Sequence, residues 1–142
     1  MSLDHHGIAL VQRSLAKLRA ELPPGDTRFY ENLFRRDPDL RRLFRDDLAG
    51  QGMRFMSTLA LITDALTTPN TLGAELTRLA KGHRAMQVPT SAYGPMGDAL
   101  FETFREVLGQ AFTAETEEAW RTAYAMIAAQ MIARGDAPLG SR

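Results

Sequence analysis

The histidines and the lack of cysteine decide which metal chemistry this sequence can support. The chain has 142 residues with 3 His and 0 Cys. The lack of cysteine excludes disulfides, thiolate catalysis, iron–sulfur clusters, cysteine-bound zinc and thioether-attached haem. His5 and His6 stand side by side near the N-terminus, where an exposed pair is expected. His83 is the internal histidine, and it is the residue whose surroundings could give it a chemical role.

His83 completes a helical stripe. Leu76, Leu79, Ala80 and His83 recur at i, i+3, i+4 and i+7, so we expect the imidazole to face the core. Burial favours its neutral form, which can accept a hydrogen bond or bind a metal. Taken alone, such a residue is either a hydrogen-bonded core histidine or a metal ligand. Zinc is the weaker metal hypothesis because no second internal His and no His-Glu-x-x-His motif accompanies it, whereas haem iron needs a single axial ligand.

The elements that must position these residues are predicted to be helices. Valine and isoleucine, the strongest strand formers, occur only seven times, and no segment alternates apolar and polar residues for long. We expect Asp26 or Thr27 to cap a second helix, Asp37-Pro38 to open a short third one, and Thr113 to cap the last. A long helix is predicted from Gln51, after a polar stretch over 45–50, to near Pro69. Apolar stripes predict the core: Ile8, Val11, Leu15, Leu18 and Leu22; Phe29, Tyr30, Leu33 and Phe34; Phe55, Leu59, Ile62 and Leu66; Met96, Leu100, Phe104, Val107, Leu108 and Ala111; Trp120, Ala123, Tyr124, Ile127, Ala128 and Met131.

Length and charge bound the remaining classes. A chain of 142 residues is expected to form one domain over 1–142, with frayed ends over about 1–7 and 135–142. Because 17 Lys+Arg balance 17 Asp+Glu, nothing attracts phosphate backbones, and we expect no nucleic-acid partner. Charged residues interrupt every apolar stretch near the N-terminus, so neither a signal peptide nor a membrane span is expected. A cytoplasmic protein is predicted.

Several motifs in order resemble the bacterial single-domain haemoglobins and the globin domain of flavohaemoglobins. They are FYENLF at 29–34, DPDL at 37–40 followed by Phe44, QGMRFM at 51–56, His83, Tyr93 ten residues later, and AWRTAY at 119–124. The resemblance covers about Ile8 to Met131, and several matches in the right order are more specific than one motif. It implies an all-α globin fold around a noncovalent haem b.

The resemblance implies a role for each matching residue. His83 would ligate the iron, with the Leu79 carbonyl as acceptor for its other N–H. Tyr30 and Gln51 would line the distal side and donate hydrogen bonds to the diatomic ligand, each worth about 1.5–3 kcal/mol. From the residues alone, the preferred interpretation is that Tyr30 is a core aromatic whose hydroxyl bonds a backbone carbonyl, and that Gln51 is a solvated residue in a first helical turn.

The other cofactor contacts are also expectations from this resemblance. Phe44 would pack on the porphyrin face, and Tyr93 would lie on the proximal side near His83. Arg54 would either reach a haem propionate or lie free on the surface. Phe55 and Val88 complete the residues expected to contact the cofactor.

Two departures from the family pattern matter. Flavohaemoglobins place a Glu near the end of the last helix that pairs with the proximal His and Tyr, whereas this chain has Arg134 and Gly135 there, with Asp136 beyond. A proximal imidazole without a carboxylate partner donates less charge to iron, which favours a reversible oxygen binder. Phe55 stands where the family usually has a smaller aliphatic residue, so a tighter distal pocket is expected.

The sequence therefore predicts a haem b globin that reversibly binds oxygen and related ligands, NO and CO among them, for oxygen storage or transport. The first alternative is a nitric oxide dioxygenase that depends on a separate reductase, because the chain ends where a flavohaemoglobin continues into its reductase domains. The second is a haem-free sensor or interaction module with a globin fold. Turnover separates the first alternative from the carrier, and a haem absorption band separates the second.

Overall fold

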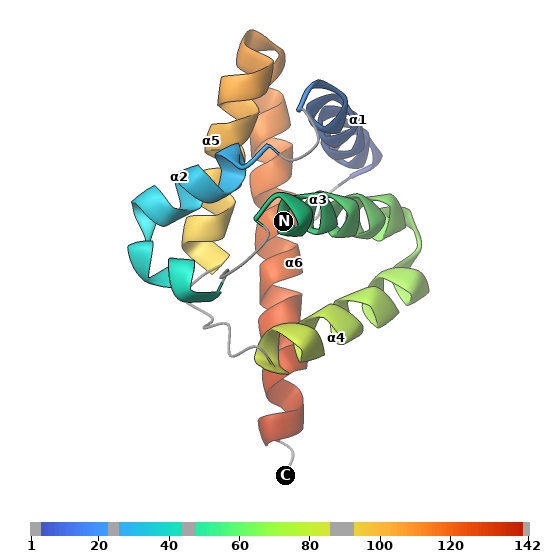
Figure 1. The fold of residues 1–142 in the computed structure, drawn as a ribbon. Coiled ribbons are helices and arrows are strands. Elements are labelled where there is room, and N and C mark those ends of the chain that lie inside the picture. The colour runs from blue at the N-terminus through green and yellow to red at the C-terminus, as the bar shows by residue number, and fades with distance from the viewer. Residues whose placement is uncertain (1–3, 23–25, 44–47, 86–92, 141–142) are drawn as a thin grey trace.

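The described part of the chain is built from helices and contains no strand (Figure 1). In this computed structural model the described residues are 4–22, 26–43, 48–85 and 93–140, and the side chains of 42–43, 48–55, 69, 82–85 and 134–140 lie outside the description. The α-helices are α1 (His5–Glu21), α2 (Arg28–Arg36), α3 (Leu48–Asp64), α4 (Pro69–Ala85), α5 (Tyr93–Leu108) and α6 (Ala114–Gly140). Short 3-10 helices are η1 (Pro38–Leu43), η2 (Ala65–Thr67) and η4 (Gly109–Ala111). The predicted all-α class is confirmed.

Side-chain caps explain where several helices begin. The Asp4 carboxylate accepts a hydrogen bond from the Gly7 backbone N–H at 2.7 Å. At α6 the Thr113 hydroxyl accepts from the Thr116 N–H at 3.1 Å, as predicted. At α2 Thr27 holds the N-cap position without a capping hydrogen bond from its side chain, and the Asp26 carboxylate accepts from the Arg28 N–H at 2.7 Å. Each bond satisfies a backbone donor that the helix itself leaves unpaired.

Several helix boundaries differ from the prediction. Helix α3 begins at Leu48, inside the stretch expected to be a polar connection, and Pro69 begins α4 instead of ending the preceding helix. Proline suits a first helical position because its missing N–H would have no intrahelical partner there. Helix α1 begins at His5 and α6 runs to Gly140, so both helices reach into the ranges expected to fray, and the fraying itself stays a prediction.

Helix α6 is the longest element, and α1, α4 and α5 all contact it. Helix α2 packs on α5, and α3 contacts α1, α2 and α4. Figure 1 shows α4 crossing the lower half of α6, while α2 lies beside α5 on the other side of the molecule. Helix α3 therefore touches both the helix that carries Tyr30 and the helix that carries His83.

The buried side chains form two clusters. The aromatic cluster consists of Val11, Leu15, Leu18, Phe29, Tyr30, Leu33, Leu40, Met56, Leu59, Ala99, Leu100, Phe101, Phe104, Leu108, Phe112, Ala119, Trp120 and Ala123. The aliphatic cluster consists of Ile62, Ala65, Leu72, Leu76, Ala80, Ile127 and Met131. Leu66 packs against both, so the clusters meet beside η2. The predicted apolar stripes thus supply most of both clusters.

No helix in the described ranges is long and apolar enough to cross a membrane.

Candidate functional site

Helix α2 presents Tyr30 to the interior. The Tyr30 side chain is only 3 % exposed and belongs to the aromatic cluster. Its ring meets Phe29 edge-on with centroids 5.1 Å apart and stacks on Phe34 at 6.0 Å. These contacts hold the ring from two sides, so the phenol has little freedom to swing. Tyr30 is thus a buried aromatic with a hydrogen-bonding group, as both interpretations of the sequence require.

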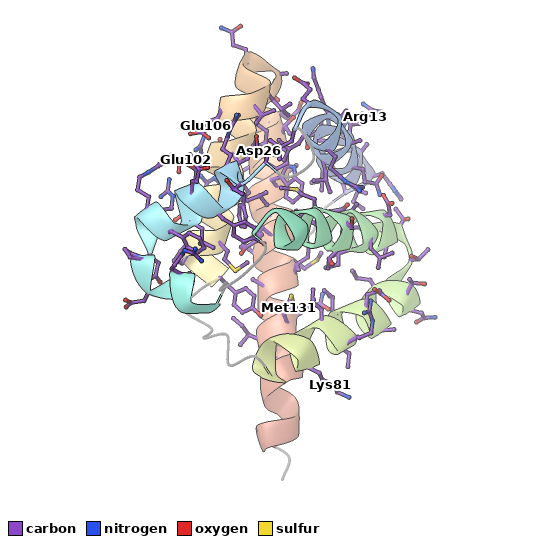
Figure 2. The ribbon with its side chains drawn as sticks, viewed as in Figure 1. Arg13, Asp26, Lys81, Glu102, Glu106 and Met131 are labelled. Carbon is purple, nitrogen blue, oxygen red and sulfur yellow. The ribbon has the colours of Figure 1, made fainter. Side chains whose placement is uncertain are left out.

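Helix α4 carries His83 in its last turn. Leu76 and Ala80, which share its predicted stripe, are 0 % and 2 % exposed and pack in the aliphatic cluster with Ile127 and Met131 of α6. Figure 2 shows Met131 on α6 just above the place where α4 crosses it. Leu76 and Ala80 are therefore buried as predicted, and Leu79 is partly buried against the same cluster. The His83 side chain lies outside the described residues, so its core-facing orientation stays a prediction.

Tyr93 begins α5 and is half-buried against the aliphatic cluster. Its backbone carbonyl accepts a 2.7 Å hydrogen bond from the hydroxyl of Tyr124 on α6. Burial raises the pKa of the Tyr124 phenol, and the nearby Tyr93 and Asp98 raise it further. Because the phenol stays protonated, it remains a donor and ties the start of α5 to α6.

The other predicted site residues lie on α3 or outside the description. Gln51, Arg54 and Phe55 fall in the first half of α3, which contacts α2 and α4, but their side chains are not among those described. Phe44 and Val88 lie outside the described residues altogether. The fold therefore brings together the helices that carry Tyr30, Gln51 and His83, and the roles of the individual side chains stay predictions.

The donor set limits how this chain could hold a metal. Among the described residues no group of three or more His, Cys, Asp or Glu is placed to bind a metal ion. His5 and His6 are exposed, and the His6 ring bonds the Glu115 carboxylate at 3.1 Å. A porphyrin brings four nitrogens of its own and needs one strong axial ligand, and His83 is the single internal histidine. The single internal histidine therefore fits haem, which needs one protein ligand.

Comparison with known proteins identifies the family. Residues 27–131 match the family model described as Globin. The chain belongs to the globin family. Haem binding is expected of this family, and globins bind diatomic gases.

Relatives of this globin include larger proteins and one of similar size. A flavohemoprotein from Vibrio cholerae is 26 % identical over 135 residues, which cover 93 % of this chain and 34 % of that protein. A flavohemoprotein from Halalkalibacterium halodurans is 33 % identical over 103 residues, covering 70 % of this chain and 25 % of that protein. A neuroglobin from Dissostichus mawsoni is 27 % identical over 136 residues and covers 86 % of each chain. The globin thus spans about a third or less of the flavohemoproteins that it matches. The predicted resemblance to the globin domain of flavohaemoglobins is confirmed.

Sequence reasoning missed one polar group of this globin. Asn32 is 1 % exposed, and its amide nitrogen donates to the Thr103 hydroxyl and to the Glu106 carboxylate on α5, both at 3.1 Å. The Asn32 carbonyl oxygen accepts from the Arg35 guanidinium at 2.9 Å. Thr103 carried a signal, because it is polar and lies next to Phe104 on the side of α5 predicted to be apolar. The pairing itself joins residues 71 positions apart and has no local signature.

A second missed pair joins α1 to α6. The Trp120 indole N–H donates to the Ser14 hydroxyl at 2.7 Å, and both groups are buried. The Ser14 hydroxyl in turn lies 2.7 Å from the Leu10 carbonyl one turn earlier. Ser14 lies between the buried Val11 and Leu15 in the sequence, which was the available signal. The bond lets a large aromatic side chain be buried without an unpaired donor.

Proposed function

We propose that this globin binds one noncovalent haem b through His83 and reversibly takes up oxygen and related diatomic ligands. The observation that carries the proposal is the burial of Tyr30 on α2, next to a helix that bears Gln51 and within the stretch that matches the globin family. Haem b, when bound, supplies an iron centre that takes up small gases such as oxygen, CO and NO. The chain's own residues then determine how tightly each gas is held.

His83 would hold the haem iron in this proposal. Its position on the stripe of Leu76 and Ala80 supports a core-facing imidazole, and burial favours the neutral form that ligates metal. The Leu79 carbonyl, one turn earlier, would accept from the other ring N–H and fix the tautomer. A carbonyl is a weaker acceptor than a carboxylate, so the imidazole stays close to neutral. This favours reversible binding over oxidation chemistry.

Tyr30 and Gln51 act as donors to the gas. A phenol held by two aromatic neighbours is preorganised, so little conformational entropy is lost when it donates. A hydrogen bond from the phenol strengthens with the negative charge on its acceptor, and with haem present oxygen would carry more of that charge than CO would. Tyr30 would therefore favour oxygen over CO.

An absorption spectrum of the purified protein tests the cofactor. We expect a Soret band that shifts on reduction and again on exposure to oxygen or CO, and a pigment that acid butanone extracts. A chain without a Soret band after expression with ample haem would overturn the proposal in favour of a haem-free module. Sustained conversion of nitric oxide to nitrate with an external electron donor would instead favour the dioxygenase, because each turnover consumes one electron.

Replacing Tyr30 by phenylalanine tests the donor role. If the hydroxyl contributes about 1.5–3 kcal/mol, Tyr30→Phe should raise the oxygen dissociation rate about ten- to a hundredfold and the CO rate far less. Stopped-flow rates for both gases measure this. Tyr124→Phe is the matched control, because it also removes one phenolic hydroxyl from the interior but should leave the oxygen-to-CO ratio unchanged. Equal changes for both gases in Tyr30→Phe would mean that Tyr30 only shapes the cavity.

A further inference from the structure

The Asn32 amide is a buried polar side chain that joins α2 to α5. It makes three hydrogen bonds, two as donor to Thr103 and Glu106 and one as acceptor from Arg35. A buried amide is destabilising unless such bonds are made, so an apolar residue of similar size would serve packing equally well. The bonds therefore contribute something that packing does not, namely a fixed direction.

That direction concerns how α2 is rotated about its own axis. Each residue turns an α-helix by about 100°, so Asn32 and Tyr30 lie about 160° apart, on nearly opposite sides of α2. Holding Asn32 against α5 thus turns Tyr30 away from α5. Apolar contacts such as those of Leu33 tolerate small rotations and slides, whereas a hydrogen bond weakens steeply when its angle changes.

The acceptor on α5 is itself fixed. Thr103 is 0 % exposed, and its hydroxyl donates to the Ala99 carbonyl at 2.8 Å while it accepts from Asn32. Its hydrogen therefore points away from Asn32, and a lone pair faces the amide. Figure 2 shows Glu102 and Glu106 on α5 beside α2. At the more open edge, Arg35 and Arg36 both bond the Glu102 carboxylate at 3.0 Å, which holds the same two helices with a more exposed and hence weaker contact.

We propose that Asn32 is a positioning residue for ligand binding: its bonds to Thr103 and Glu106 set the rotation of α2 and so aim the Tyr30 phenol at the bound diatomic gas. This inference rests on the proposed function and deepens it. Asn32 would thus influence the preference for oxygen over CO from the face of α2 opposite to Tyr30, whose phenol contacts the gas.

Two substitutions at Thr103 separate positioning from stability. Thr103→Val keeps the shape but removes the acceptor, and Thr103→Ser keeps the acceptor but removes a buried methyl group. We expect Thr103→Val to raise the oxygen dissociation rate about three- to tenfold, less than Tyr30→Phe because the bond is misaligned and not deleted, with the CO rate changed less than about twofold. Thr103→Ser should stay within about twofold for both gases even if its melting temperature falls. Glu106→Ala changes an exposed residue and should shift the oxygen rate in the same direction by a smaller factor.

A second readout reports on Tyr30 without measuring gas binding. Purified protein labelled with ¹³C at the tyrosine ring should give three tyrosine signals, and the one missing in Tyr30→Phe belongs to Tyr30. We expect that signal to move in Thr103→Val and to stay in place in Thr103→Ser. Hydrogen exchange of the α2 amides should quicken in the valine variant alone.

The outcomes distinguish the two proposals. A valine variant with the wild-type oxygen-to-CO ratio and an unmoved Tyr30 signal would overturn the positioning role of Asn32. Equal effects of valine and serine would also overturn it, because packing alone would then explain both. If Tyr30→Phe leaves the oxygen rate unchanged, the proposed role of Tyr30 in gas binding fails, and a Tyr30 signal that moves only in Thr103→Val would still support the control of α2 by Asn32.

Discussion

The aromatic and aliphatic clusters of this globin are held together in different ways. In the aromatic cluster Phe104 stacks on Phe112 with centroids 4.7 Å apart and meets Trp120 at a tilt with centroids 5.1 Å apart. The buried hydrogen bonds of Ser14 and Asn32 lie beside this cluster. The aliphatic cluster contains only aliphatic side chains and methionine, with Tyr93 at its margin. The first cluster therefore has directional contacts, and the second depends on contacts without a preferred direction.

This difference matches the two sides of the proposed haem site. Hydrogen bonds to α5 fix the rotation of α2, which carries Tyr30. Tyr30 needs this fixed rotation if its hydroxyl is to point at the bound gas. Helix α4, which carries His83, contacts α6, and Leu76 and Ala80 of α4 pack there with Ile127 and Met131 in the aliphatic cluster. A strong iron–imidazole bond would itself help to fix the position of α4.

The largest expected effects come from large-to-small changes in the two clusters. Phe104→Ala should lower the free energy of unfolding by about 3–5 kcal/mol, because it removes a fully buried ring that packs against the rings of Phe112 and Trp120. Leu76→Ala should lower it by about 2–5 kcal/mol. Chemical denaturation measures both values.

The rate of haem loss should be higher in Leu76→Ala than in Phe104→Ala, although Phe104→Ala is expected to lose more stability. Leu76 shares the stripe of His83, so the cavity left by Leu76→Ala should loosen α4 and speed transfer of haem to an excess of apomyoglobin. Phe104→Ala should change this rate less at equal loss of stability. Faster haem loss from Phe104→Ala than from Leu76→Ala would contradict the proposal that the aliphatic cluster holds His83 in place.

The sequence predicts well which apolar side chains are buried. Val11, Leu15 and Leu18 are buried on α1, and Leu76 and Ala80 on α4, because helical spacing alone decides which residues share a face. The family motifs also predict which helices carry the candidate ligands. These features depend on local order in the chain.

The buried hydrogen-bond partners could not be predicted from the sequence, for a physical reason. Asn32 and Thr103 are 71 positions apart and Ser14 and Trp120 are 106 apart, and such partners are chosen by the packing of whole helices. A polar residue within an apolar stripe signals that a partner exists, but it does not identify the partner. The boundary at Pro69 was misplaced because proline can end one helix or begin the next.

Two glycines of α5, Gly97 and Gly94, test how tightly the edge of the aromatic cluster is packed. A Cβ built at Gly97 would lie 2.7 Å from Cε2 of Tyr124, whereas one at Gly94 would meet nothing within 4 Å. Gly97→Ala should therefore lower the free energy of unfolding by about 1–3 kcal/mol through overpacking. Gly94→Ala should raise it by up to about 1 kcal/mol, because alanine loses less backbone entropy in a helix. Thermal unfolding compares the two, and similar effects would mean that Tyr124 moves aside freely.

The smallest effect on stability is expected at the ion pair between Arg105 of α5 and Glu117 of α6. Hydrogen bonds from Arg105 and then Arg121 lower the pKa of the Glu117 carboxyl. A lowered pKa gives stability that is present above the unfolded pKa and is lost as pH falls through the folded pKa. Because the pair is partly exposed, Glu117→Gln should reduce stability by less than about 1 kcal/mol at neutral pH. The difference should vanish in strong acid, and unfolding curves from pH 7 down to pH 2 measure it. A difference independent of pH would show that Glu117 acts through packing.

Haem retention in two histidine variants tests the central claim most directly. His83→Ala removes the proposed axial ligand, and His6→Ala removes an exposed imidazole that bonds Glu115. The measurement is the Soret absorbance per chain after purification and gel filtration with haem supplied in excess. We predict that His83→Ala loses stable haem, while His6→Ala keeps one haem per chain with the wild-type spectrum. A His83→Ala protein that keeps haem with an unchanged spectrum would contradict the account.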